Sequence, residues 1–269
     1  MMLSALLLLL QSAAAPDALP TLREVQFSEC IALALNDPGS AVVQASEWGK
    51  KDGGYLAKAC HGQALANDFK FAEALPLLRD AAKGAEAAKD KRAARFWAQA
   101  GNAAIAASLP DEGLKAVDAA LASPTLSAKE QADCQVDRAR ALVALGREAD
   151  AAGALAAARQ ADAQNGMAWL LSATLARRLN KLPDALGYIQ TAAALLQHDP
   201  AVPLEAGNIA AAAGDDIAAR KQWEQVIAVA PKSRQAETAK ARLTELGPAP
   251  AASAPAASAL PATADDQAR

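Results

Sequence analysis

Cysteine and histidine side chains are the first candidates for chemistry in this sequence, but their spacing predicts neither a metal site nor a catalytic pair. The chain of 269 residues has three cysteines and two histidines. His61 and His198 lie far apart, and neither has a second ligand at metal-binding spacing. Cys60 directly precedes His61, and adjacent residues of a helix do not face each other, so these two would not form a nucleophile and its base. Nearby aspartates would raise the pKa of the Cys134 thiol, so we interpret this residue as packed rather than reactive.

The other polar residues form no catalytic motif. The sequence has no P-loop, no dinucleotide-binding glycine motif, no H-E-x-x-H and no G-x-S-x-G. Its carboxylates are scattered along the chain. A net charge of −3 gives no broad attraction to nucleic acids or anionic lipids. We therefore expect a protein that is not an enzyme, needs no cofactor or metal and binds no nucleic acid.

The two ends of the chain differ in composition from its middle. Residues 1–15, MMLSALLLLLQSAAA, are a leucine-rich run followed by small residues, which predicts a signal peptide cleaved after Ala15. The run is too short for a free-standing membrane span, and no Lys or Arg precedes it, so an uncleaved anchor or a misplaced start codon is the alternative. Residues 247–269 are rich in Pro, Ala and Ser, which predicts a disordered tail or a semi-extended tether. We expect a periplasmic or otherwise exported protein with no membrane span after processing.

The middle of the chain follows a repeated pattern. Hydrophobic residues make up 52% of the sequence and aromatic ones only 4%, so the core must be built mostly from alanine and leucine. In residues 213–231, AGDDIAARKQWEQVIAVAP, the helical frame of Ala219, Trp223 and Val226 returns in four earlier segments. The equivalent residues are Ala185, Ile189 and Ala192; Ala151, Leu155 and Ala158; Gly113, Val117 and Ala120; and Ala74, Leu78 and Ala81.

Each of these segments follows a first helix with its own apolar stripe, clearest at Trp97, Ala100, Gly101 and Ala104. In three contiguous units, Gly146, Asn180 or Gly214 falls between the two helices. Because glycine and asparagine tolerate the positive φ with which helices often end, these residues predict the turns. The contiguous units are 132–165, 166–199 and 200–233, two more are 55–88 and 94–127, and a shortened one runs from about residue 25 to 54.

This pattern resembles the tetratricopeptide repeat family, whose signature is W-x2-L-G-x2-Y, then A-x3-F, then P, at a period of 34 residues. The signature positions held here are Gly62, Trp97, Gly101, Gly207, Ala219, Trp223 and Pro231, whereas alanine usually replaces the signature leucine and tyrosine. The resemblance, to an exported bacterial member of the family, implies an all-α fold. We expect a right-handed solenoid of about six helix-turn-helix repeats over residues 16–246, closed by a capping helix at 234–246.

The resemblance also implies a function, since first-helix side chains of the family line a concave groove. The predicted groove residues are Gln63, Asn67, Gln99, Asn102, Asp137, Arg140, Thr174, Arg177, Arg178, Glu205 and Asn208. A groove of amides and charges suits an extended peptide or a partner helix, which makes the chain a noncatalytic interaction scaffold and, by analogy, an envelope assembly or coordination factor. The alternatives are a solvated face with no partner, an adaptor acting through its tail or the loop at 123–128, and a small-molecule-binding or enzymatic repeat protein.

The cysteines and the tryptophans give two predictions about helix packing. Cys30 and Cys60 fall at equivalent points of two successive first helices, which predicts a disulfide, with two buried thiols as the alternative. The tryptophans at signature positions, Trp97, Trp169 and Trp223, are predicted to lie in the core. The register of the shortened unit leaves the place of Trp48 open.

Overall fold

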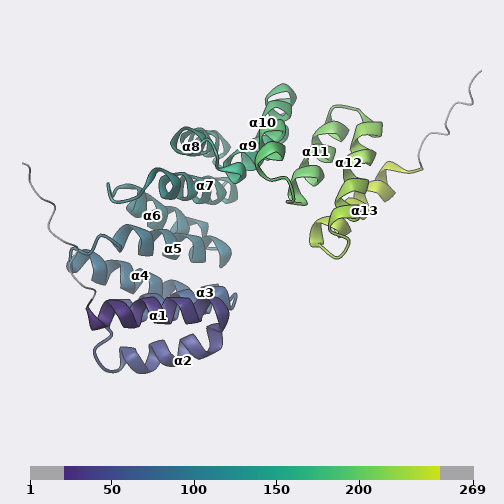
Figure 1. Cartoon of the computed structure of the whole chain (residues 1–269). Helices are drawn as coiled ribbons and strands as arrows, with labels where there is room; N and C mark the ends of the chain where they lie inside the picture. Colours follow the sequence, from purple (N-terminus) through teal and green to yellow (C-terminus); the bar gives the residue numbers. More distant parts are fainter. Residues whose placement is uncertain (1–20, 249–269) are drawn as a thin grey trace, which may run out of the picture. The chain divides into compact units, whose positions relative to one another are not determined.

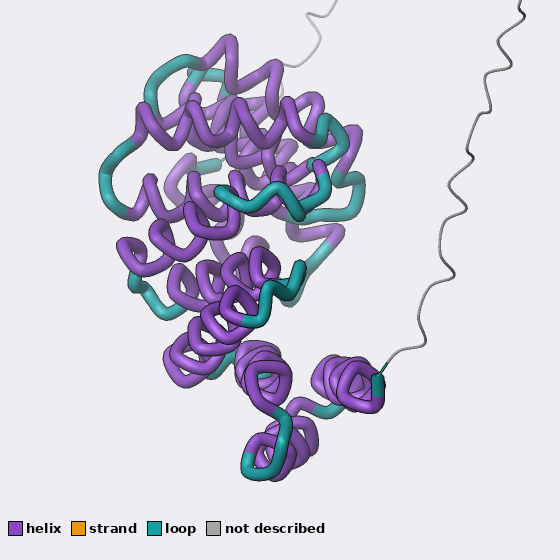
Figure 2. Tube along the Cα trace, turned by 90° about the vertical axis from the view of Figure 1, so that its left-hand side faces the viewer, coloured by secondary structure: helices purple, strands orange, loops and turns teal. Residues whose placement is uncertain are grey.

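A computed structural model describes residues 21–248, and within that range the chain forms thirteen helices and no strand (Figures 1 and 2). The described residues divide into two compact units with a boundary between Ala161 and Asp162. Unit 1 holds α1 (Leu22–Asn36), α2 (Pro38–Gly49), α3 (Gly54–Asn67), α4 (Phe71–Ala87), α5 (Ala93–Ala106), α6 (Pro110–Leu121), α7 (Ala128–Ala144) and α8 (Glu148–Ala161). Unit 2 holds α9 (Gly166–Arg178), α10 (Leu182–Leu195), α11 (Ala201–Ala212), α12 (Asp216–Val229) and α13 (Arg234–Leu246).

The helices form six consecutive pairs followed by one closing helix, which confirms the predicted repeat units and the predicted helix at 234–246. The shortened first unit is the pair α1 and α2, joined by a single residue, Asp37, whose carboxylate accepts a hydrogen bond from the Ser40 amide. The boundary between the two units falls in the short loop after α8, next to the predicted repeat boundary at residues 165–166. The continuity of one array over residues 16–246 and its right-handed winding stay predictions, and the predicted signal peptide and residues 249–269 of the predicted tail lie outside the described residues.

Small residues set how closely the paired helices pack. The predicted second-helix frames are buried throughout, including Leu78, Val117 and Val226, which are fully buried. A Cβ added at Gly62 would lie 2.7 Å from the Leu78 Cγ atom, so the signature glycine is needed where α3 crosses α4. Alanine and glycine therefore bring the helix backbones together, and one larger side chain from the second helix fills each crossing.

Five turns between paired helices share one backbone geometry. In each, the second residue after the first helix has positive φ, and the next amide donates to a carbonyl five residues earlier, as in a Schellman motif. The positive-φ residues are Phe69, Ser108, Gly146, Asn180 and Gly214. Gly146, Asn180 and Gly214 confirm the prediction from the sequence. Phe69 departs from it, because a bulky residue in this conformation is strained by about 1–2 kcal/mol relative to glycine.

The tryptophans differ in burial. Trp223 is buried, as predicted, and so is Trp48. Trp97 and Trp169 pack against the core but remain partly exposed, because their indole N–H groups donate outward to the Glu86 carboxylate and the Ala163 carbonyl oxygen. The prediction that Trp97, Trp169 and Trp223 lie in the core is therefore fully confirmed only for Trp223.

Candidate partner-binding faces

The predicted groove residues all lie on first helices. In unit 1 these helices are α3, α5 and α7, and in unit 2 they are α9 and α11. We call these surfaces the first-helix face of unit 1 and the first-helix face of unit 2. Within each unit, neighbouring first helices lie side by side, so polar side chains on one helix reach those on the next.

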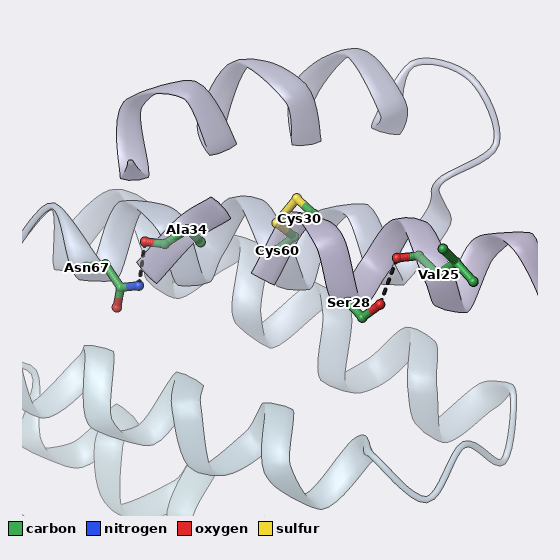
Figure 3. Close-up of a disulfide and its surroundings, with 6 residues drawn as sticks. All are labelled: Val25, Ser28, Cys30, Ala34, Cys60 and Asn67. Carbon is green, nitrogen blue, oxygen red and sulfur yellow. Dashed lines mark hydrogen bonds between the residues drawn. A yellow bond between two sulfur atoms is a disulfide. The ribbon is translucent and has the colours of Figure 1, made fainter. Parts of the chain in front are cut away.

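At the start of unit 1, α1 and α3 are joined by a disulfide between Cys30 and Cys60 (Figure 3). The two Cα atoms lie 6.1 Å apart, within the range that a disulfide spans, and both residues are fully buried. Farther along α3, the Asn67 amide donates to the Ala34 carbonyl oxygen at 2.8 Å, and Gln63 donates to the Asn67 side-chain oxygen at 2.9 Å. Asn67 therefore ties the end of α3 to the end of α1, and Gln63 remains the more available amide of the pair.

The centre of the first-helix face of unit 1 is a hydrogen-bonded set of three residues. Asn102 on α5 donates to the Asp137 carboxylate on α7 at 3.3 Å, and Arg140 donates to the other oxygen of the same carboxylate at 2.8 Å. Burial raises the pKa of Asp137, while Arg140 and Asn102 act in the opposite direction. Gln99 lies one turn before Asn102, and its buried side-chain oxygen has no hydrogen-bond partner in residues 21–248. This part of the face therefore presents the exposed Asn102 amide and the partly buried Gln99 side chain beside one ion pair.

The first-helix face of unit 2 is built around a buried carboxylate. Glu205 on α11 is only 6% exposed, and its two oxygens accept hydrogen bonds from Arg177 on α9 at 2.7 and 3.2 Å. Asn208 donates to the same carboxylate at 3.2 Å. Glu205 itself is therefore too buried for broad contact with a partner, and its place in the predicted groove is that of a residue that orients Arg177 and Asn208.

Two other predicted groove residues of unit 2 stay outside this set. The Thr174 hydroxyl donates to the Leu170 carbonyl oxygen of its own helix at 3.1 Å. Arg178 is exposed in the last turn of α9, where a cation interacts favourably with the helix dipole. The structure thus forms three groups of predicted residues. These are Gln63 with Asn67, Asn102 with Asp137 and Arg140, and Arg177 with Glu205 and Asn208.

A hollow of about 390 Å³ at the end of unit 2 is lined in part by residues outside the predicted groove. It is lined by Arg177 and Asn208 from the first helices and by Asp216, Trp223, Arg242 and Leu246 from α12 and α13. The closing helix α13 thus forms one wall of the surface where Arg177 lies. First-helix positions alone could not identify this wall, because its residues come from a second helix and from the closing helix.

The remaining candidates for chemistry do not gather on these faces. Burial, together with Asp137, Asp133 and Glu130, raises the pKa of the Cys134 thiol to about 12, which leaves it protonated at neutral pH. Burial lowers the pKa of His61. The loop at 123–128, the predicted alternative recruitment site, is held by a hydrogen bond from the Thr125 hydroxyl to the Lys91 carbonyl oxygen, and Leu126 is buried. Across residues 21–248, no helix has the length and apolar character needed to cross a bilayer.

Comparison with known proteins identifies the fold. No model of a known protein family matches the chain, and no curated protein matches it in sequence. The structure of PilW, described as a widely conserved type IV pilus biogenesis factor, is similar with a TM-score of 0.69 and 19% identity over 81% of this chain and 98% of that one. PilF of Pseudomonas aeruginosa is similar with a TM-score of 0.64 and 17% identity over 82% of this chain and 99% of that one.

A third similar structure is YrrB, described as a TPR protein with an unusual peptide-binding site, with a TM-score of 0.50 and 19% identity over 75% of this chain and 98% of that one. These likenesses, at under 20% identity, concern the fold. Together with the six helix pairs, they show that the chain has the all-α tetratricopeptide-repeat fold that its sequence resembles.

Proposed function

We propose that this protein is a noncatalytic scaffold that binds a peptide or a partner helix along its first-helix faces. The observation that carries the proposal is the run of polar side chains across successive first helices, from Asn102 to Asp137 and from Arg177 to Glu205. Amide groups at helix spacing can hydrogen-bond a peptide backbone, and an arginine held by a buried carboxylate presents its remaining N–H groups in a fixed orientation.

We further propose that the scaffold works in the bacterial envelope as an assembly or coordination factor. The predicted signal peptide supports export, and a disulfide between Cys30 and Cys60 is a feature of proteins that fold in oxidising compartments. The similar protein PilW is described as a pilus biogenesis factor, which supports an assembly role by analogy of fold. No observation on the described residues favours an enzyme over this scaffold.

A crosslinking experiment on the full chain in its native envelope tests the proposal. We would compare wild type with a Gln99→Ala, Asn102→Ala variant, which removes two amides from the first-helix face of unit 1 without leaving a buried charge unpaired. The matched control is Gln222→Ala, Gln225→Ala, which removes two amides from the second helix α12. We expect one protein to be crosslinked by wild type and control, and to be lost with the first variant. Equal recovery with all three proteins would refute binding at this face.

A further inference from the structure

The turn between α3 and α4 carries a residue that the fold does not explain. Four of the five equivalent turns place Ser108, Gly146, Asn180 or Gly214 at the positive-φ position, all of them small or with a short polar side chain. The fifth places Phe69 there, with φ of 60°. An aromatic side chain is disfavoured in this conformation, and such outliers gather at functional positions.

The Phe69 ring also gains little from the folded chain. It is 81% exposed, and its aromatic contact is with Phe71, edge to face, at 6.1 Å between ring centroids. An aromatic ring contributes to folding mainly through the apolar surface that it removes from water. Both the backbone conformation of Phe69 and the exposure of its ring are therefore unfavourable for folding, and no contact within unit 1 buries the ring.

Phe69 has apolar neighbours at the ends of the adjacent first helices. Leu35 near the end of α1 is 70% exposed, and Leu109 after α5 is 41% exposed. The bond from Asn67 to Ala34 places the end of α3 beside the end of α1, and the packing of Leu65 in one cluster with Ala104 places it near the end of α5. We call Leu35, Phe69, Phe71 and Leu109 the turn-edge patch. It lies at the ends of the first helices and in the turns that follow them, close to the groove residue Asn67, and it includes none of the predicted groove residues.

Acidic side chains border this patch. Glu73 lies in the first turn of α4 and Asp111 in the first turn of α6, and neither forms a salt bridge within residues 21–248. Asp68 is paired with Lys70 at 2.8 Å and Glu112 with Arg79 at 3.2 Å, and Lys70 also attracts Glu73. The four carboxylates at these turns, Asp68, Glu73, Asp111 and Glu112, outnumber the cations Lys70 and Arg79. An anionic lipid surface would therefore be repelled, whereas Lys or Arg side chains would be attracted.

We propose that the turn-edge patch is a second interaction surface, which docks the apolar side of a basic amphipathic helix from a partner protein. Phe69 inserts between apolar residues of that helix, as aromatic anchors do at the centre of protein interfaces. Lysine or arginine residues beside the apolar stripe pair with Glu73 and Asp111. This surface uses none of the predicted groove residues, so its variants leave the groove side chains unchanged.

The test uses Phe69→Asn, which removes the ring and supplies the residue type that occupies the same turn position at Asn180. The probe is a fluorescent synthetic helix with leucines at i, i+3, i+4 and i+7 and lysines elsewhere. We expect the variant to bind the probe about tenfold more weakly or worse. Its Tm should stay the same or rise by about 2 °C, because strain is relieved. Ile217→Asn is the matched control, since Ile217 is 73% exposed beside the equivalent turn in unit 2, and its affinity should equal that of wild type.

The charge of the partner is tested separately. We expect a Glu73→Gln, Asp111→Asn variant to bind the lysine probe about threefold more weakly, and a glutamate version of the probe to bind wild type poorly. Unchanged affinity in Phe69→Asn would overturn the proposal, as would a fall of several degrees in its Tm, which would give the ring a structural role. Flotation with phosphatidylglycerol vesicles that depends on Phe69 would identify a lipid instead, and a dimer that depends on Phe69 would identify a second copy.

Discussion

The first-helix faces of the two units use the same repeat backbone but present different chemistry. In unit 1 the face is mostly neutral, with the amides of Gln63, Gln99 and Asn102 beside the Asp137–Arg140 pair. In unit 2 it is centred on the Arg177–Glu205 pair, whose carboxylate is nearly buried. The repeat backbone thus determines the positions of the polar groups, and the residue types at those positions determine what each unit can bind.

The units also differ in how their ends are held. Unit 1 begins with a short helix pair that is fastened through a buried disulfide and the Asn67 bond to Ala34. Unit 2 ends with α13, which covers the core around Trp223. A repeat at the end of an array lacks one neighbour, so its exposed apolar side must be covered or its chain restrained. In unit 1 a disulfide restrains the first helix pair, and in unit 2 the closing helix α13 covers the apolar side of the last pair.

The largest expected loss of stability is at the end of unit 2, where α13 covers the core around Trp223. Trp223→Ala should lower the free energy of unfolding by about 3–5 kcal/mol, since the ring is buried against Gly207 and the closing helix. Trp97→Ala in unit 1 should cost less, about 2 kcal/mol, because that ring is partly exposed. Urea unfolding followed by circular dichroism measures both. Equal losses would contradict the assigned difference in burial.

Reduction of the disulfide should have the next largest effect. Opening the bond between Cys30 and Cys60 removes the closure of a loop of 30 residues and should destabilise unit 1 by about 3–4 kcal/mol in the chain-entropy model. We expect one thiol, that of Cys134, to titrate in the denatured protein before reduction. Three thiols would show that the bond is not formed. Hydrogen exchange should show that reduction loosens α1 and α2 while α11 to α13 keep their protection.

Neutralising the central carboxylate of each face compares the two polar sets directly. Glu205→Gln leaves the partly buried Arg177 without its counter-charge and should cost about 2 kcal/mol. Asp137→Asn should cost less than about 1 kcal/mol, because burial already raises the pKa of Asp137 and Arg140 is more exposed. Chemical unfolding of the two variants checks the order. A larger loss for Asp137→Asn would reverse the comparison.

The last expected effect is on the acid stability of unit 1. Burial alone would raise the pKa of Asp90, but hydrogen bonds from Arg92 and Tyr55 lower it to about 2, below the ordinary value of 3.8. Because the folded pKa is the lower one, this stabilisation is fully present above about pH 4 and is lost as the pH falls towards 2. Asp90→Asn should remove up to about 2 kcal/mol at pH 6 and less at pH 2.5. An equal loss at both pH values would show that the carboxylate charge is not responsible.

Much of the fold could be predicted from the sequence, because helical period and small residues at fixed positions decide how such repeats pack. The frame of Ala219, Trp223 and Val226 and its four equivalents located the buried side of α4, α6, α8, α10 and α12, and Gly146, Asn180 and Gly214 located three turns. Phe69 could not be found in this way, since its residue type argues against the conformation that the Schellman hydrogen bonds impose.

The site was predicted less completely. Repeat positions indicated that Arg177 and Glu205 lie on one face, but they could not show that Glu205 is buried beneath Arg177, because that depends on the distance between α9 and α11. The wall that Arg242 and Leu246 add to the hollow in unit 2 depends on how α13 packs, which no repeat position encodes.

Site-specific photocrosslinking tests the central claim most directly. A benzophenone amino acid would replace Asn102 on the first-helix face of unit 1 or, as the control, exposed Lys115 on the second helix α6 of the same pair. The account predicts that position 102 forms an adduct with one partner protein and that position 115 forms none. An adduct from position 115 without one from position 102 would contradict it and would move the binding site to the second helices.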